Sequence, residues 1–309
     1  MRRIVSLLPS ATEMVCALGA RERLVGVSHE CDFPPEVVGL PILTTSKVSS
    51  SGTSAQIDAE IRVSMTNALA VYDVDDSLLA EVRPDLIVTQ DLCEVCAVSF
   101  SDVERAVAKL AGEACRIVSL PPTRLDDVFE DLRRVGVAIG AEERAEACIA
   151  GYRDRIAAIA RRAARAPERP TVLTIEWLEP IMIGATWMPE LVAYAGGEAL
   201  VTRPGDHAPT LDEAALAQLA PDVVVVKPCG FDLARTRQEV APLRALMQRL
   251  DWPAWRQGRV WLADGNAFFN RPGPRLVESL EILAACMHPE LFADLGAAHA
   301  GDFESLTRA

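Results

Sequence analysis

The chain has 309 residues, half of them hydrophobic, with a formal net charge of −13 and a pI near 4.9. At roughly 100–200 residues per domain, this length predicts two compact units with ample core material. The acidic balance argues against nucleic-acid binding, which normally needs a basic face to displace counterions. No apolar run approaches the ~20 residues that cross a bilayer, so no membrane insertion is expected.

The first part of the chain alternates between strand and helix patterns. Residues 4–8 form an apolar strand, and the helix after it fits a capping box with Ser10 at the N-cap and Glu13 at N3. Gly19 is expected to end that helix. Residues 44–54, rich in Ser and Thr, predict a loop. Further strands are predicted at 23–27, 86–89 and 116–119, with helices ending at Val82 and covering 103–110.

A long helical segment follows at residues 124–166, divided by Gly140. At 1.5 Å per residue, the part from 141 to 165 predicts a helix roughly 35 Å long, which could run between two domains. Pro167 and Pro170 are expected to end it.

A second α/β pattern completes the chain. Its strands are predicted at 172–175, 222–226 and 259–262, and its helices at 188–194, 211–219 and 275–287. Two segments of the first part recur here: 18–25 resembles 195–201, and 79–88 resembles 216–225. The first part carries an insertion of about forty residues between them.

The predicted fold is therefore α/β, with two Rossmann-like lobes whose mainly parallel sheets are joined by one long interlobe helix. The expected boundaries are 1–123 for the N-terminal lobe, 124–168 for the connecting helical segment, and 169–309 for the C-terminal lobe and tail.

Several motifs together resemble one family. Residues 3–13 resemble the opening of the periplasmic vitamin B12 and siderophore receptors, which are substrate-binding proteins of the helical-backbone class. The Pro-Asp pairs at 84–85 and 221–222 resemble their repeated helix–turn–strand element, and residues 271–275 and 288–290 their C-terminal segment. The resemblance spans about residues 3–290. It implies a rigid interlobe helix and a corrinoid (cobalamin-like) or other metal chelate held between the lobes.

The N-terminus differs from that of the secreted receptors. Arg2 and Arg3 precede an apolar run, but Pro9 and polar residues interrupt it and no clean cleavage site follows. We therefore expect a cytoplasmic subgroup resembling cobalamin-binding proteins, or a periplasmic protein if a leader has been removed. Docking to an ABC permease is in doubt without a signal peptide.

Three polar segments each follow a predicted parallel strand. They are His29-Glu30-Cys31-Asp32, Gln90-Asp91-Leu92-Cys93-Glu94-Val95-Cys96 and Lys227-Pro228-Cys229-Gly230. Because ligands bind outside the carboxyl ends of strands in open parallel sheets, the segments are expected to meet at one cleft.

The cysteines of these segments suggest metal chemistry. Cys31, Cys93, Cys96 and Cys229 are candidate metal ligands, since thiolates favour zinc, copper(I) or an iron–sulfur cluster. The Cys93/Cys96 pair also suits thiol–disulfide exchange, and plain core packing remains open. The other four cysteines of the chain, Cys16, Cys115, Cys148 and Cys286, lie among apolar residues and are predicted to be core residues.

Aromatic residues after the strands of the second lobe suggest a pocket for a flat macrocycle, with a few polar groups fixing it. Core packing is an equal alternative for each aromatic residue. Arg271, beside Asn270, could meet an anionic substituent. The candidate ligand-binding residues are His29, Glu30, Asp32, Gln90, Asp91, Glu176, Trp177, Trp187, Phe231, Phe269, Asn270 and Arg271.

No catalytic motif is found: there is no phosphate loop, nucleophile elbow or H-E-x-x-H. Three hypotheses stay open. The first is a binding protein for a corrinoid or related chelate, acting as carrier, buffer or sensor. The second is a cysteine-ligated metal or iron–sulfur protein, possibly an enzyme. The third is a thiol-redox protein.

Overall fold

The computed structural model describes residues 2–49, 51–66, 72–90 and 115–306. Contacts divide the chain into two compact units. Unit 1 comprises Met1–Gly52, Gln56–Pro122 and Asp126–Gly151, and unit 2 comprises Thr53–Ala55, Thr123–Leu125 and Tyr152–Ala309. Helix α6 (Glu142–Ala163) begins in unit 1 and ends in unit 2, as expected of the connecting helix.

Unit 1 is built on a parallel sheet with the strand order β2-β1-β5-β6. Its strands are β1 (Ile4–Ser6), β2 (Leu24–Val27), β5 (Leu86–Gln90) and β6 (Arg116–Leu120). The chain passes from β1 to β2 on one side and returns to β5 on the other, so β1 and β5 flank a topological switch point. Ser6 pairs with both Val27 and Val88, which brings the carboxyl ends of three strands to one edge.

The remaining elements of the first half are a small antiparallel pair and several helices. The pair is β3 (Thr44–Ser46) with β4 (Tyr72–Val74), so part of the predicted loop at 44–54 is a strand. The helices are α1 (Pro9–Ala17), α2 (Ser54–Thr66), α3 (Asp76–Val82) and α5 (Leu125–Ile139), with 3-10 turns at Arg21–Arg23 and Pro35–Val37. The predicted helix at 103–110 lies outside the described residues.

The capping-box prediction for α1 is wrong. The helix begins at Pro9, its N-cap residue is Leu8, and no side chain caps it. Proline is favoured at the first helical position because it lacks the N–H that would need a partner there. Ser10 therefore stands inside the helix, and both Ser10 and Glu13 are buried.

Unit 2 is built on a mixed sheet with the order β12-β11-β10-β7-β8, and β9 also pairs with β7. The strands are β7 (Thr171–Leu178), β8 (Ile181–Ile183), β9 (Glu198–Ala199), β10 (Val223–Val226), β11 (Val260–Ala263) and β12 (Phe303–Ser305). β7, β9, β10 and β11 are parallel, whereas β8 and β12 are antiparallel. The four valines of β10 are fully buried, as expected of a central parallel strand.

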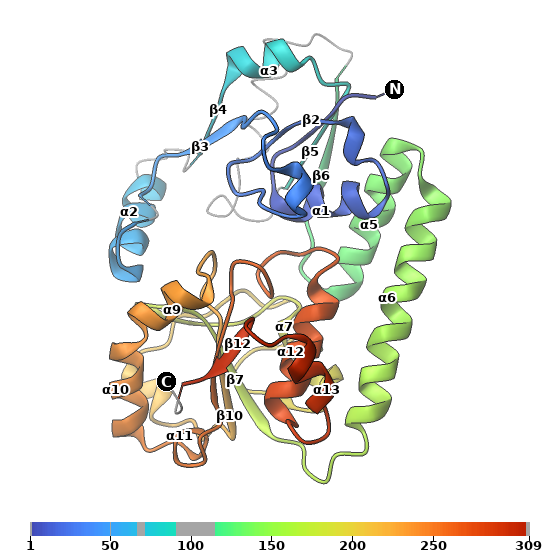
Figure 1. The fold of residues 1–309 in the computed structure, drawn as a ribbon. Coiled ribbons are helices and arrows are strands. Elements are labelled where there is room, and N and C mark those ends of the chain that lie inside the picture. Colours follow the sequence, from blue (N-terminus) through green and yellow to red (C-terminus); the bar gives the residue numbers. More distant parts are fainter. Residues whose placement is uncertain (1, 50, 67–71, 91–114, 307–309) are drawn as a thin grey trace. The chain divides into compact units, whose positions relative to one another are not determined.

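Helices cover the sheet of unit 2, with α7 and α12 on one side and α10 on the other (Figure 1). They are α7 (Met188–Tyr194), α8 (Glu213–Leu216), α9 (Leu233–Glu239), α10 (Ala241–Leu250), α11 (Pro253–Arg256), α12 (Leu276–Met287) and α13 (Ala293–Ala298). The predicted mainly parallel α/β fold is confirmed. Across the described part of the chain, no helix has the length and apolarity needed to cross a membrane.

The internal repeat begins with matching helix caps. The Asp75 carboxylate accepts a hydrogen bond of 2.9 Å from the backbone N–H of Leu78, at the start of α3. The Asp212 carboxylate accepts one of 2.8 Å from Ala215, at the start of α8. Each aspartate satisfies an N–H that the first helical turn leaves unpaired.

The repeat continues with a feature that we call the Pro-Asp clamp. Asp85 and Asp222 each follow a proline and precede a strand. Asp85 accepts a 2.7 Å hydrogen bond from the backbone N–H of Arg3, beside β1, and Asp222 accepts one of 2.9 Å from Thr171, the first residue of β7. Each clamp fixes the starting register of two neighbouring parallel strands.

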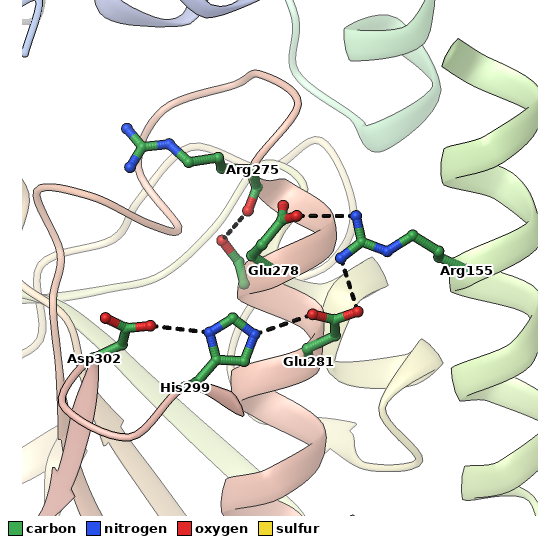
Figure 2. Close-up of polar contacts among 7 residues, drawn as sticks. Arg155, Arg275, Glu278, Glu281, His299 and Asp302 are labelled. Carbon is green, nitrogen blue, oxygen red and sulfur yellow. Dashed lines mark hydrogen bonds and ion pairs between the residues drawn. The ribbon is translucent and has the colours of Figure 1, made fainter. Parts of the chain in front are cut away.

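A chain of ion pairs, here the His299 network, joins three parts of unit 2 (Figure 2). His299 lies 3.0 Å from Glu281 of α12 through Nε2 and 2.9 Å from Asp302 through Nδ1. Arg155 of α6 donates to Glu281 at 2.8 Å and to Glu278 at 2.9 Å. The network ties the segment after α13 to α12, and α12 to α6.

Candidate functional site

In unit 1 the predicted site residues gather where the parallel strands end. His29, Glu30, Cys31 and Asp32 follow β2, and the buried Gln90 ends β5. The common register of β1 with β2 and β5 brings these two segments to the same edge of the sheet. Asp91, Cys93 and Cys96 lie outside the described residues.

The His29 ring is held in a fixed orientation. Its Nδ1 lies 2.7 Å from the hydroxyl of Thr44, which also accepts the backbone N–H of His29 at 3.1 Å. Tyr72 packs against the ring with 5.3 Å between centroids and donates to the Glu30 carboxylate at 3.2 Å. Partial burial of the ring lowers the pKa of His29 and so favours its neutral form, although the residue as a whole is exposed.

Cys31 contacts α1. Its sulfur lies 3.1 Å from the hydroxyl oxygen of Thr12, which is itself 2.8 Å from the hydroxyl of Ser6. Thr12 and Ser6 are completely buried, so this side of Cys31 faces the interior of unit 1.

In unit 2 the edge at the carboxyl ends of β7 and β10 carries a buried charge. Lys227 follows β10 and is completely buried. Its ammonium donates to the Glu176 carboxylate at 3.0 Å and to the Asn270 side-chain oxygen at 2.7 Å. A buried ammonium needs such partners because its removal from water is costly.

The position of Glu176 follows from an irregularity in β7. The pairing of β7 with β8 shifts between Ile175 and Trp177, the two residues that flank Glu176. A β-bulge redirects side chains and is common beside functional sites. The backbone oxygen of Glu176 also accepts the N–H of Cys229 at 3.0 Å, which brings the segment after β10 to this strand.

The predicted aromatic residues fall into two groups. Trp177 and Phe231 form a tilted pair with 5.3 Å between ring centroids, and the Arg235 guanidinium lies 4.8 Å from the Phe231 ring. The indole N–H of Trp177 donates to the Ser54 backbone oxygen at 3.2 Å. Trp177 stays partly accessible, which suits contact with a ligand.

Trp187 and Phe269 are interior residues. They are 6% and 1% exposed, and the Trp187 indole N–H donates to the Phe269 backbone oxygen at 2.8 Å. Arg271 is buried as well and donates to the Asn266 side chain at 2.9 Å. These three residues support the edge from within unit 2.

The described cysteines differ in their surroundings. Cys286 is fully buried, burial raises the pKa of Cys16 to about 11, and Cys229 is exposed. Within the described residues, no group of three or more His, Cys, Asp or Glu side chains could hold a metal ion. A site using Cys93 and Cys96 stays a prediction, because both lie outside those residues.

Three residues that organise these edges were not among the candidates predicted from the sequence. Lys227 belongs to the third polar segment, and a lysine directly after four valines is a recognisable anomaly. Thr44 and Tyr72 carried no such signal, because their contacts with His29 depend on the β3–β4 pair.

The fold and these polar edges define a two-unit α/β substrate-binding protein. The family model described as a periplasmic binding protein matches residues 4–267, and the chain belongs to this family. The resemblance drawn from residues 3–13 and the Pro-Asp pairs is thereby confirmed.

Two known proteins are similar to the chain in sequence, and one solved structure is similar in fold. An uncharacterized ABC transporter substrate-binding lipoprotein of Bacillus subtilis is 23% identical over 302 residues, covering 95% of this chain and 82% of the relative. A vitamin B12-binding protein of Pectobacterium atrosepticum is 23% identical over 282 residues, covering 89% and 85%. A periplasmic heme-binding protein from Pseudomonas aeruginosa shares the fold, with a TM-score of 0.67 at 22% identity over 94% and 93% of the two chains.

Proposed function

We propose that this protein binds a corrinoid of the cobalamin type, with heme as the competing ligand. The observation that carries the proposal is the partly accessible Trp177 ring, which packs against the buried Phe231 ring and follows Glu176, the ion-pair partner of Lys227, near the carboxyl end of β7. Apolar rings next to a few fixed polar groups are typical of sites for large organic ligands, and this is the sheet edge where open α/β folds bind them. Membership of a family with a vitamin B12-binding relative supports the same ligand class.

The direct test is calorimetric titration of the purified chain with cyanocobalamin and, separately, with hemin. We expect saturable one-to-one binding of cyanocobalamin with a dissociation constant of about 1 μM or less. This corresponds to a binding free energy of about −8 kcal/mol or more negative. If hemin binds saturably and cyanocobalamin does not, the ligand is a porphyrin and the corrinoid assignment is wrong. Binding of neither ligand would refute the proposal.

The location of the site is tested by tryptophan fluorescence. Trp177→Phe should remove most of the quenching that a coloured corrinoid causes and should weaken binding. Trp255→Phe is the matched control, because Trp255 is also partly exposed but lies on α11, whose Ala254 bonds to Pro221 at the opposite end of β10. Equal quenching in both variants would place the ligand elsewhere.

The cytoplasmic location, and with it the question of delivery to a permease, stays a prediction. Fractionation of the source cells with an antibody to this chain would test it.

A further inference from the structure

The buried Lys227 ammonium has two hydrogen-bond partners, and one of them, Asn270, is held by the surrounding backbone. Asn270 donates its side-chain N–H groups to the backbone oxygens of Lys227 and Gly265, at 3.0 and 2.8 Å. This orientation leaves the amide oxygen of Asn270 facing the ammonium, 2.7 Å away. The amide cannot flip without losing three hydrogen bonds.

Glu176 is the partner that also reaches the surface. One carboxylate oxygen, Oε2, accepts the hydrogen bond from Lys227, whose side chain is 1% exposed, while the Glu176 side chain keeps 24% of its surface exposed. The β7 bulge lies at Glu176, near the carboxyl end of the strand where the candidate site is, and Trp177 is the next residue along the strand. Glu176 is thus a preoriented hydrogen-bond acceptor at the candidate site.

We propose that Glu176 makes the site selective for a chelate whose side chains end in amides over one whose side chains end in carboxylates. A primary amide offers N–H donors to the Glu176 carboxylate, whereas an ionised carboxylate offers none and is repelled by it. Corrinoid side chains carry amides, and porphyrin propionates are carboxylates. The inference rests on the proposed function and names the chemical feature of the ligand that is recognised.

The nearby cations do not reverse this preference. Lys227 is too deeply buried to touch a ligand, and its ammonium is already bound by Glu176 and Asn270. Arg271 is 9% exposed and donates to Asn266. The Arg235 guanidinium, over the Phe231 ring, is paired with Glu239 at the surface of α9.

The test compares two corrinoids that share the ring and the cobalt. Dicyanocobinamide carries side-chain amides, and dicyanocobyrinic acid carries carboxylates in their place. We expect the wild-type chain to bind the amide form at least tenfold more tightly, and Glu176→Gln to reduce that ratio about tenfold, the range of one hydrogen bond to a charged group. The neutral amide of glutamine can donate to a carboxylate, so the acid form should gain affinity.

Two further variants keep the result interpretable. Glu213→Gln removes the same charge from α8, where Glu213 forms an exposed ion pair with Arg249 of α10, and it should leave the ratio unchanged. Glu176→Gln with Lys227→Met removes the buried pair as a whole, so no uncompensated charge is left to unfold unit 2. Circular dichroism and thermal unfolding establish that each variant is folded.

A reduced ratio in both Glu176 variants, but not in Glu213→Gln, supports the inference. A wild-type chain that binds both corrinoids equally, or Glu176 variants that keep the full preference, overturns it while the proposed function stands. Failure of the wild-type chain to bind either corrinoid or cyanocobalamin overturns the inference together with the corrinoid assignment.

Discussion

Asp131 of α5 is a completely buried carboxyl group with the Arg134 guanidinium beside it. Arg134 donates to Oδ1 at 2.8 Å, and no described residue provides a hydrogen-bond partner for Oδ2. Burial raises the pKa of Asp131 to about 7, against the opposing effect of Arg134. The folded protein therefore keeps a proton that an exposed aspartate loses near pH 4.

The sign of the resulting pH dependence is fixed by that proton. The pKa of Asp131 is higher in the folded state than its ordinary value of 3.8, so its contribution to stability is lost as pH rises from about 4 to about 7. Asp131→Asn cannot ionise, and we expect it to be more stable than the wild type by about 1–2 kcal/mol at pH 8, with a smaller gain at pH 5. Urea unfolding at both pH values measures this. A stability difference between the two proteins that does not change with pH would contradict it.

The thiols of the described cysteines should differ in reactivity. The thiolate is the nucleophile, so burial of Cys286 and the pKa of about 11 at Cys16 protect both, whereas Cys229 is exposed. We expect iodoacetamide to alkylate Cys229 in the native protein, and Cys16 and Cys286 only after unfolding. Peptide mass spectrometry over time gives the order. Native alkylation of Cys286 at the rate of Cys229 would disprove it.

At the scale of elements, the His299 network fixes the C-terminal segment to α12. Carboxylates face both nitrogens of the His299 ring, so the ring donates in both directions only when it carries two protons. The hydrogen bond with Glu281 raises the pKa of His299 above its ordinary value, outweighing burial. Burial alone would raise the pKa of Glu281, but hydrogen bonds from His299 and Arg155 bring it below its usual range.

The network predicts a second pH effect, in the same direction. Since the pKa of His299 is raised in the folded state, its stabilising contribution is complete below about pH 6.5 and is lost as pH rises through the folded-state value. His299→Gln should remove this dependence, and the difference in unfolding free energy between wild type and variant should shrink as the pH rises from 6 to 9. Hydrogen exchange of residues 293–305 would show the same loss locally. A constant gap would mean that the ring is neutral.

The sequence predicted elements best where the signal is local. Helix α7 was placed at 188–194 and strand β10 within 222–226, because a short apolar helix and a valine run need no tertiary information. α8 was expected over 211–219 but spans only Glu213–Leu216. The site was harder. The strand-end rule singled out the segments that begin at His29, Gln90 and Lys227, but the pairing of Lys227 with Asn270, which is distant in sequence, could not be predicted.

At the scale of the molecule, a ligand that binds only the folded chain raises its free energy of unfolding. Cyanocobalamin at about 100 times its dissociation constant should add ~2.7 kcal/mol at 25 °C. Urea unfolding with and without the ligand measures the increase. Trp177→Leu, tested at the same ligand concentration, should gain less because its affinity is lower. An unchanged unfolding midpoint for the wild type would argue against corrinoid binding.

The division of the chain also limits how its halves can be separated genetically. Unit 2 includes Thr53–Ala55 and Thr123–Leu125 as well as the stretch from Tyr152 onward. Ser54 accepts from the Trp177 indole and donates to Glu239, and Leu125 donates to Glu190. A gene fragment that begins at codon 152 omits all of these backbone partners. A truncation that starts at the beginning of the second half therefore cannot keep the hydrogen bond between Trp177 and Ser54.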